Sequence, residues 1–155
     1  MNITRSLAML VLFLGVVAVV LGVVFIAQGM AKDDLLVKAM QQEKITLGIP
    51  TEELAEGEMI DSAKEAEVAG DTVREHRHGI APTYGDLLGG KQYDPTDTTQ
   101  LKYAQALNLE NYLYLAVLGF GVTQLVIGSG AFMIITGLAL GGTGTALLKL
   151  NRRLS

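Results

Sequence analysis

The sequence predicts an all-α membrane protein in which two long helices form a two-span transmembrane hairpin and carry a small acidic cap of helix and loop. Three observations lead to this fold class. Half of the residues are hydrophobic, and they gather in two blocks rather than recurring periodically along the chain. Neither block contains a charged residue, and each is long enough to cross a bilayer. All acidic residues lie between the blocks, whereas only basic residues mark the two ends.

The first block, residues 7–29, follows a short segment of residues 1–6 and predicts transmembrane helix 1, because about 20 apolar helical residues cross a hydrocarbon core of about 30 Å. The second block, residues 112–148, would be a helix about 55 Å long, which is more than one span requires. Two spans there would place the basic tail, residues 149–155, outside. We therefore expect one long helix that contains transmembrane helix 2 and projects beyond the membrane.

The distribution of charge predicts the orientation. All 16 Asp and Glu lie in the segment 30–111. Four of the 12 basic residues stand at the two ends without an acidic neighbour, and these are Arg5, Lys149, Arg152 and Arg153. Short basic flanks stay on the cytoplasmic side. The sequence thus predicts a plasma-membrane protein with both termini in the cytoplasm and residues 30–111 outside. A cleaved signal peptide is the alternative for the first block, but its apolar run exceeds the usual h-region of about 7–15 residues.

The outer segment is expected to be helical at its edges and in its middle. The first helix should continue through residues 31–44 on the strength of its apolar spacing, and end before an extended stretch at residues 45–50 that contains glycine and proline. Thr51 has the character of an N-cap for an acidic helix that runs towards Arg77. The chain contains no cysteine, so the cap must be held by packing alone.

Residues 79–96 are rich in glycine and proline and predict an irregular connector. Asp97, with Gln100 three positions later, has the form of a capping box. The final helix should begin there, outside the membrane, and run into the second apolar block.

Small residues recur every seven positions in both blocks, and a seven-residue period keeps one stripe on a left-handed supercoil. In lipid, helices associate through close van der Waals contact, which small residues permit. We interpret the stripes as helix-packing surfaces; the alternative is that glycine is simply common in membrane helices. The stripe residues are Ala8, Gly15, Gly22 and Gly29 in the first block, and Ala116, Thr123, Gly130, Gly137 and Gly144 in the second.

The spans contain polar but no charged side chains, and charged residues are what usually mark ion or proton routes. A transporter component is therefore a weak hypothesis. Gln124 and Ser129 are interpreted as hydrogen-bonding across helices.

The only cluster with metal-ligating chemistry is Glu75, His76 and His78. Neutral imidazole is a common transition-metal ligand, but residues two apart on a helix point in different directions. The competing interpretation places basic groups at the C-terminal end of an acidic helix, where the dipole favours them. Asp94 and Asp97 lack the further oxygen ligands of a calcium loop, and a turn followed by an N-cap explains both.

No catalytic signature and no cofactor motif is visible, so we expect the protein not to be an enzyme. The acidic outer segment makes nucleic acid an unexpected partner. The main hypothesis is a structural or scaffold membrane protein that self-associates, or a small accessory subunit of a larger membrane complex. The alternatives are a ligand- or metal-binding sensory subunit that uses the outer loop and, more weakly, a transporter component. The expected partners are the lipid bilayer and other copies of the chain or other membrane subunits.

Overall fold

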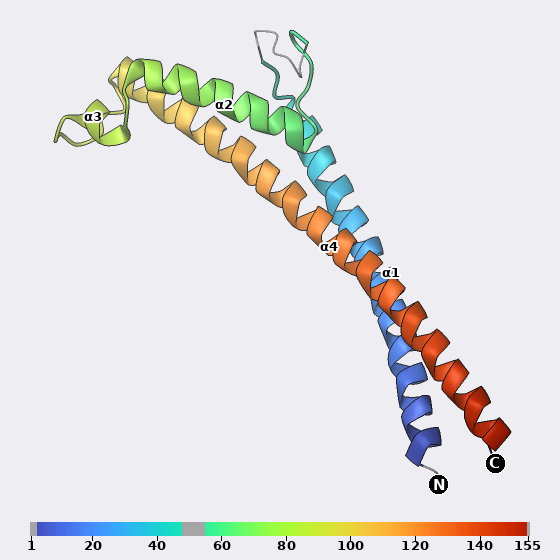
Figure 1. The fold of residues 1–155 in the computed structure, drawn as a ribbon. Helices are drawn as coiled ribbons and strands as arrows, with labels where there is room; N and C mark the ends of the chain where they lie inside the picture. Colours follow the sequence, from blue (N-terminus) through green and yellow to red (C-terminus); the bar gives the residue numbers. More distant parts are fainter. Residues whose placement is uncertain (1–2, 48–54, 155) are drawn as a thin grey trace. The chain divides into compact units, whose positions relative to one another are not determined.

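The computed structural model describes residues 3–47 and 55–154, and these residues form helices joined by turns and loops. The elements are α1 (Ile3–Glu43), α2 (Ala63–Ile80), α3 (Tyr84–Leu88) and α4 (Thr98–Leu154) (Figure 1). No strand is present among the described residues. The expected all-helical fold is therefore confirmed, including the continuation of the first helix to Glu43 and the single long helix that contains the second apolar block.

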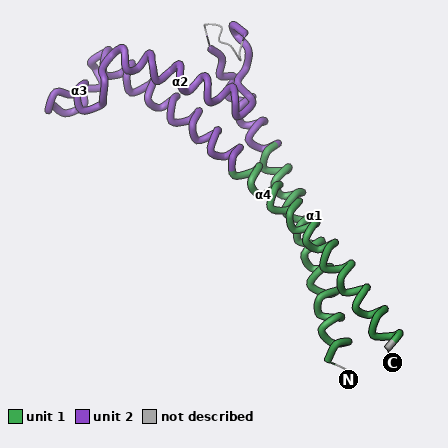
Figure 2. Tube along the Cα trace, in the orientation of Figure 1, with its two compact units in different colours: residues 1–33, 122–155 green, residues 34–121 purple. Residues whose placement is uncertain are grey.

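The chain divides into two compact units (Figure 2). Unit 1 consists of residues 1–33 and 122–155, which are the terminal parts of α1 and α4, and unit 2 consists of residues 34–121. In unit 1 the two helices run side by side in opposite directions, so both chain termini lie at the same end (Figure 1). This arrangement is the helical hairpin that the two apolar blocks predict.

The interior of unit 1 is one line of small residues between α1 and α4. Every buried residue among those described in this unit belongs to the predicted stripes: Ala8, Gly15, Gly22, Gly29, Thr123, Gly130, Gly137 and Gly144. The neighbouring large apolar side chains point outward, as Phe13, Leu125 and Phe132 do. A two-helix unit has no room for a conventional core, so this line, which we call the glycine seam, is all that it buries.

Unit 2 has a core of ordinary side chains between α2 and the parts of α1 and α4 within that unit. Met40 from α1, Val73 from α2, and Leu113 and Phe120 from α4 belong to one buried cluster. α2 approaches α4 closely at Gly70, where an added Cβ would lie 3.2 Å from Tyr114 Cε1. The apolar surface of α4 in unit 2 is therefore covered in part by α1 and α2.

The loop after α1 is extended, as predicted, over its described residues 45–47. Thr46 pairs with Met59 in an isolated antiparallel bridge, and the Ile60 N–H donates to the Ile45 carbonyl at 3.0 Å. The remaining residues of the predicted stretch and the Thr51 cap lie outside the described residues.

The middle helix begins later than predicted. Residues 55–62 are not helical, and α2 starts after Ser62. The Ser62 hydroxyl accepts from the Glu65 N–H while the Glu65 carboxylate accepts from the Ser62 N–H, which is a complete capping box. Local capping at Ser62 thus determines where the helix begins.

The connector after α2 contains the single-turn helix α3, whose N-cap is Thr83 and which ends at the left-handed Gly89 (φ 54°). α4 begins directly after Asp97, whose carboxylate accepts from the N–H groups of Thr99 and Gln100 at 2.8 and 3.2 Å. The predicted N-cap is therefore correct. The Gln100 side chain, however, accepts from the Asp94 N–H, so the capping box is not completed as expected.

Candidate functional site

The glycine seam brings the backbones of α1 and α4 into direct contact. A Cβ added to Gly22 would lie 2.6 Å from the Gly130 carbonyl oxygen, and one added to Gly137 would lie 2.6 Å from the Gly15 carbonyl oxygen. Ordinary van der Waals contact of a Cβ begins at 3.4 Å. Only glycine is compatible with this separation, which is the close approach that packing in lipid exploits.

Both ends of the seam contain residues other than glycine. At the end near the termini, an added Cβ on Gly144 would lie 3.1 Å from the Ala8 carbonyl oxygen. At the other end, the Thr123 hydroxyl donates to the Asp33 carboxylate at 2.8 Å. Ala116 is separate from the seam, because it is buried in the core of unit 2. The structure therefore joins eight of the nine stripe residues in one interface and gives the ninth a different role.

The polar residues of the second apolar block lie mostly outside the seam. Gln124 and Ser129 are exposed on the surface of the helix pair, so the structure does not place them where they would bond across it. Thr143 and Thr145 donate to carbonyl groups of their own helix, those of Ala139 and Gly142. The described part of unit 1 thus contains no line of buried polar side chains that would favour the transporter hypothesis.

The most strongly bonded group in unit 2 is a buried ion pair between α2 and α4. Arg77 and Glu110 are only 8 % and 7 % exposed. The Arg77 Nε donates to Glu110 Oε2 at 2.6 Å, and Arg77 Nη2 lies 3.3 Å from Glu110 Oε1. Arg77 Nη1 donates to the Tyr103 hydroxyl, and the guanidinium lies 4.9 Å from the Tyr103 ring centroid. The hydrogen bond to Glu110 raises the pKa of Arg77 above its usual value, although burial opposes this.

A second, more exposed set of polar contacts continues from this pair. Arg74 Nε lies 3.5 Å from Glu110 Oε1, and Arg74 also donates to the Tyr114 hydroxyl. The Tyr114 hydroxyl in turn donates to Asp71 at 2.6 Å. Burial raises the pKa of Tyr114 to about 12, and the hydrogen bond to Asp71 acts in the same direction. The tyrosine therefore remains a protonated donor at neutral pH.

These contacts clamp α2 to α4. Two arginines face two carboxylates, so the cluster carries no excess charge, and bidentate arginine–carboxylate geometry fixes the orientation as well as the distance of its partners. We assign the cluster a positioning role in the cap and call it the arginine clamp (Arg77, Glu110, Tyr103, Arg74, Tyr114 and Asp71).

The candidate metal ligands do not converge. Glu75, His76 and His78 are all exposed on α2, and the buried Arg77 lies between the two histidines in sequence. His78 Nε2 lies 3.1 Å from Arg77 Nη2 rather than turning towards His76. Among residues 3–47 and 55–154, no three His, Cys, Asp or Glu side chains form a group that could hold a metal ion. Metal binding by the outer loop remains an untested hypothesis.

The sequence reasoning missed the arginine clamp, although a signal was present. Ala66, Ala69, Val73 and Arg77 recur at helical spacing, which places an arginine on the apolar face of α2. A charged residue on such a face requires a buried partner of opposite charge. Glu110, the last acidic residue before the second apolar block, is the candidate for that partner of Arg77.

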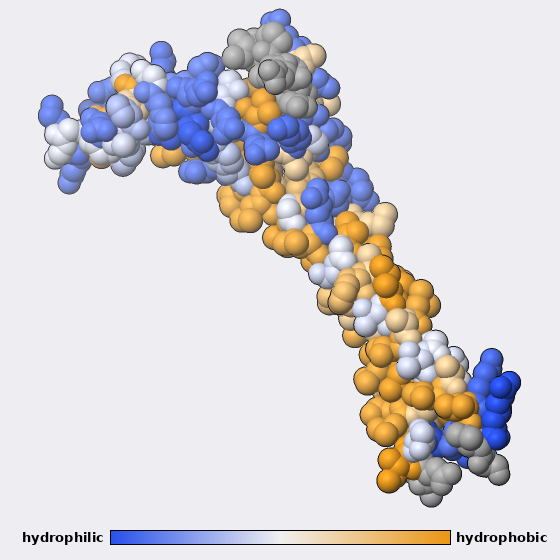
Figure 3. Space-filling view, in the orientation of Figure 1, coloured by the Kyte–Doolittle hydropathy of each residue, from blue (hydrophilic) through white to orange (hydrophobic). Residues whose placement is uncertain are grey.

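Both α1 and α4 are long and apolar enough to cross a membrane. The face of unit 1 seen in Figure 3 is predominantly hydrophobic, with hydrophilic residues gathered at the end where the termini lie. Comparison of the chain with protein-family models, with curated proteins and with solved structures gave no match.

Proposed function

We propose that this chain is a structural membrane protein that crosses the bilayer twice and self-associates through an apolar surface on α4. Its role is assembly rather than catalysis. The observation that carries the proposal is a pair of large leucines on α4 that the cap leaves uncovered: Leu115 is 66 % exposed and Leu118 is 63 % exposed.

The placement of unit 1 in a bilayer is supported by the positions of its charged residues. From Arg5 to Asp33, α1 extends about 42 Å, and from Thr123 to Lys149, α4 extends about 39 Å. Both lengths agree with a bilayer of about 40–45 Å including its headgroups. The Thr123–Asp33 hydrogen bond aligns the outer ends of the two segments. Basic residues at the other end favour cytoplasmic termini.

Leu115 and Leu118 lie beyond the outer end of these segments. The neighbouring Gly119 packs against Leu36, whose Cδ1 would lie 3.0 Å from an added Cβ, and Leu36 follows the charged Asp33 and Asp34 along α1. Charged residues at this level belong to water or headgroups rather than to hydrocarbon. Two adjacent exposed leucines there are therefore a protein-contact surface rather than a lipid-facing one.

Self-association is the favoured use of this surface because the glycine seam is already occupied within one chain. The contact surface left on α4 is therefore the face on which Leu115 and Leu118 lie one turn apart. A different membrane protein that covers the same leucines would make the chain an accessory subunit, and the experiment distinguishes the two.

The test is native mass spectrometry of the chain in mild detergent, with Leu115→Asn plus Leu118→Asn as the variant. We expect a multimer for the parent and a monomer for the variant. Met59→Asn is the control, because Met59 is also an exposed apolar residue of the cap, at 45 %. A monomeric parent that co-purifies with another membrane protein in stoichiometric amount would indicate the accessory role. A monomeric parent without any partner would refute both.

The topology is tested separately by cysteine labelling, since the chain has no cysteine of its own. Gly90→Cys should react with an impermeant thiol reagent in intact cells, and Arg153→Cys only after the membrane is opened. Reaction of the Arg153→Cys chain from outside would overturn the orientation.

A further inference from the structure

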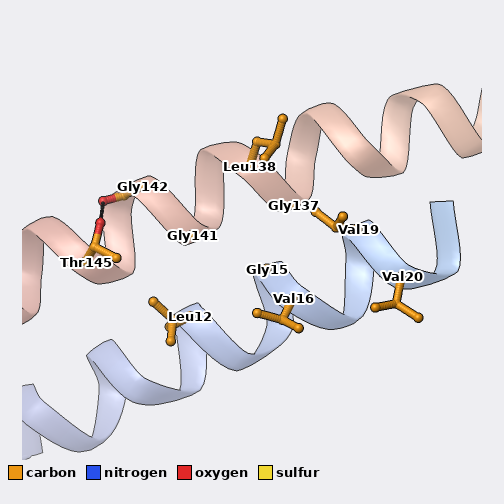
Figure 4. A pocket seen from close by; sticks show the side chains of 10 residues that line it. All are labelled: Leu12, Gly15, Val16, Val19, Val20, Gly137, Leu138, Gly141, Gly142 and Thr145. Carbon is orange, nitrogen blue, oxygen red and sulfur yellow. Dashed lines mark hydrogen bonds between the residues drawn. The ribbon is translucent and has the colours of Figure 1, made fainter. Parts of the chain in front are cut away.

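One face of unit 1 has an apolar groove with a volume of about 420 Å³. Figure 4 shows that residues of both helices border it, with glycines of α1 and α4 leaving space between the larger side chains. An added Cβ on Gly141 or Gly142 would meet nothing within 4 Å, so the space over them is open. The Thr145 hydroxyl donates to the Gly142 carbonyl and is not offered to a ligand. The principal lining residues are Leu12, Val16, Val20, Leu138, Gly142 and Thr145.

A second pocket, of about 330 Å³, lies nearer the chain termini. Arg5 from α1 and Arg152 from α4 both line it, together with Met9 and Leu148. The described part of unit 1 contains one acidic side chain, Asp33, and it lies at the opposite end of the seam. Two guanidinium groups from different helices thus border one pocket without a nearby carboxylate side chain, which suits a phosphate group.

The pocket and the groove follow each other along the same face. On α1, Arg5, Met9, Leu12 and Val16 are spaced by three or four residues, which keeps them on one side of a helix. On α4 the same spacing relates Thr145 of the groove to Leu148 and Arg152 of the pocket. The distance along α1 from Met9 to Val20 is about 17 Å, close to the about 15 Å of hydrocarbon in one leaflet.

The geometry points to a binding site for one anionic phospholipid of the inner leaflet, with its phosphate between Arg5 and Arg152 and one acyl chain along the groove. This inference depends on the proposed membrane insertion and orientation. A second copy of the chain fits the face less well. Neighbouring copies in a membrane share one orientation, so their basic ends would bring like charges to the pocket, whereas an anionic lipid brings the opposite charge.

The experiment measures lipid bound to the purified full-length chain in mild detergent by native mass spectrometry. The probes are a phosphatidylglycerol and a phosphatidylcholine with identical acyl chains. We expect one phosphatidylglycerol per chain, with at least tenfold preference over the zwitterionic lipid. Each arginine beside an anionic headgroup contributes about fivefold to binding, so Arg5→Gln plus Arg152→Gln should weaken retention about 25-fold.

Two further variants separate the parts of the site. Arg153→Gln removes the same charge from a residue that does not line the pocket, and it should change binding less than threefold. Gly142→Leu places a side chain in the open groove, where its Cβ meets no atom within 4 Å, and it should reduce phosphatidylglycerol retention while leaving cysteine labelling of the topology unchanged.

Equal retention of the two lipids, equal effects of Arg5→Gln plus Arg152→Gln and of Arg153→Gln, or full retention by Gly142→Leu would each overturn the site. Loss of the multimer in Gly142→Leu, without loss of lipid, would show instead that a second copy occupies the groove. Because topology and multimer size are measured independently, failure of the lipid site is distinguishable from failure of the proposed function.

Discussion

Replacing one seam glycine by alanine should open the hairpin, and Gly137 is the most informative position. A Cβ there would lie 2.6 Å from the Gly15 carbonyl oxygen and 2.8 Å from the Val19 nitrogen. Both atoms belong to the backbone of α1, so no side-chain rotation relieves the contact. Restoring the first contact from 2.6 to 3.4 Å requires the helices to separate locally by about 0.8 Å.

The cost of this separation follows from the packing. A radial gap of about 0.5–1 Å removes about a quarter to a half of the dispersion attraction of each contact it affects. Over-packing of a tight interface costs about 1–3 kcal/mol, which reduces the equilibrium constant for helix pairing by about 5- to 150-fold. Gly137→Ala should therefore destabilise the hairpin by this amount without preventing insertion of the chain.

The same helix provides a matched control. An added Cβ on Gly128 would meet nothing within 4 Å, so Gly128→Ala should change the pairing free energy by less than about 0.5 kcal/mol. Gly29→Ala should be intermediate, because its nearest contact is a side-chain atom, Ile127 Cγ1, at 2.5 Å, and the nearest backbone atoms are 3.3 Å away. The three substitutions add the same methyl group and differ only in what it meets.

The assay is titration of the purified protein with a denaturing detergent, followed by energy transfer between dyes on cysteines introduced at Leu7 and Ala146. Both positions are exposed, so the dyes report helix separation without entering the seam. Equal midpoints for Gly137→Ala and Gly128→Ala would refute the conclusion that backbone contact across the seam holds the two helices together.

Two further predictions concern the cap. Glu110→Ala should lower the free energy of unfolding of the cap by about 3–5 kcal/mol, because it leaves Arg77 buried without its carboxylate; the double variant Arg77→Met plus Glu110→Leu should cost less, and thermal unfolding of the full chain measures both. His76→Ala plus His78→Ala should leave folding and assembly unchanged, since both rings are exposed. A stoichiometric metal in the purified parent that disappears in this double variant would contradict the second prediction.

The parts of the fold that the sequence predicted depend on local rules. Absence of charge over a helical length predicts a span, and a seven-residue repeat of small residues predicts which face is buried. These rules were sufficient for α1, α4 and the members of the seam in unit 1. The N-cap at Asp97 is equally local, because its carboxylate accepts from N–H groups only two and three residues away.

The parts that were missed depend on contacts between distant residues. Arg77 and Glu110 are 33 residues apart. The residues next to them in the sequence do not specify that α2 lies against the turn of α4 that contains Glu110. The start of α2 was misplaced for a different reason. Ser62 and Glu65 form a local signal, but Thr51 with its acidic neighbours presents a similar pattern, and propensity alone does not choose between two possible caps.

A repeat of identical small residues determines which faces of two helices meet, but it leaves their relative register open. If α4 slid along α1 by seven residues, or about 10.5 Å, small residues would again oppose small residues over most of the seam. The slide would, however, place Ala116 or Gly130 opposite Asp33, and neither offers a hydroxyl for the bond that Thr123 makes at 2.8 Å. A hydrogen bond to a charged group contributes about 1.5–3 kcal/mol, and its loss leaves the Asp33 carboxylate without that donor. The one hydroxyl in the stripe therefore selects among registers that the glycines alone would leave nearly equivalent.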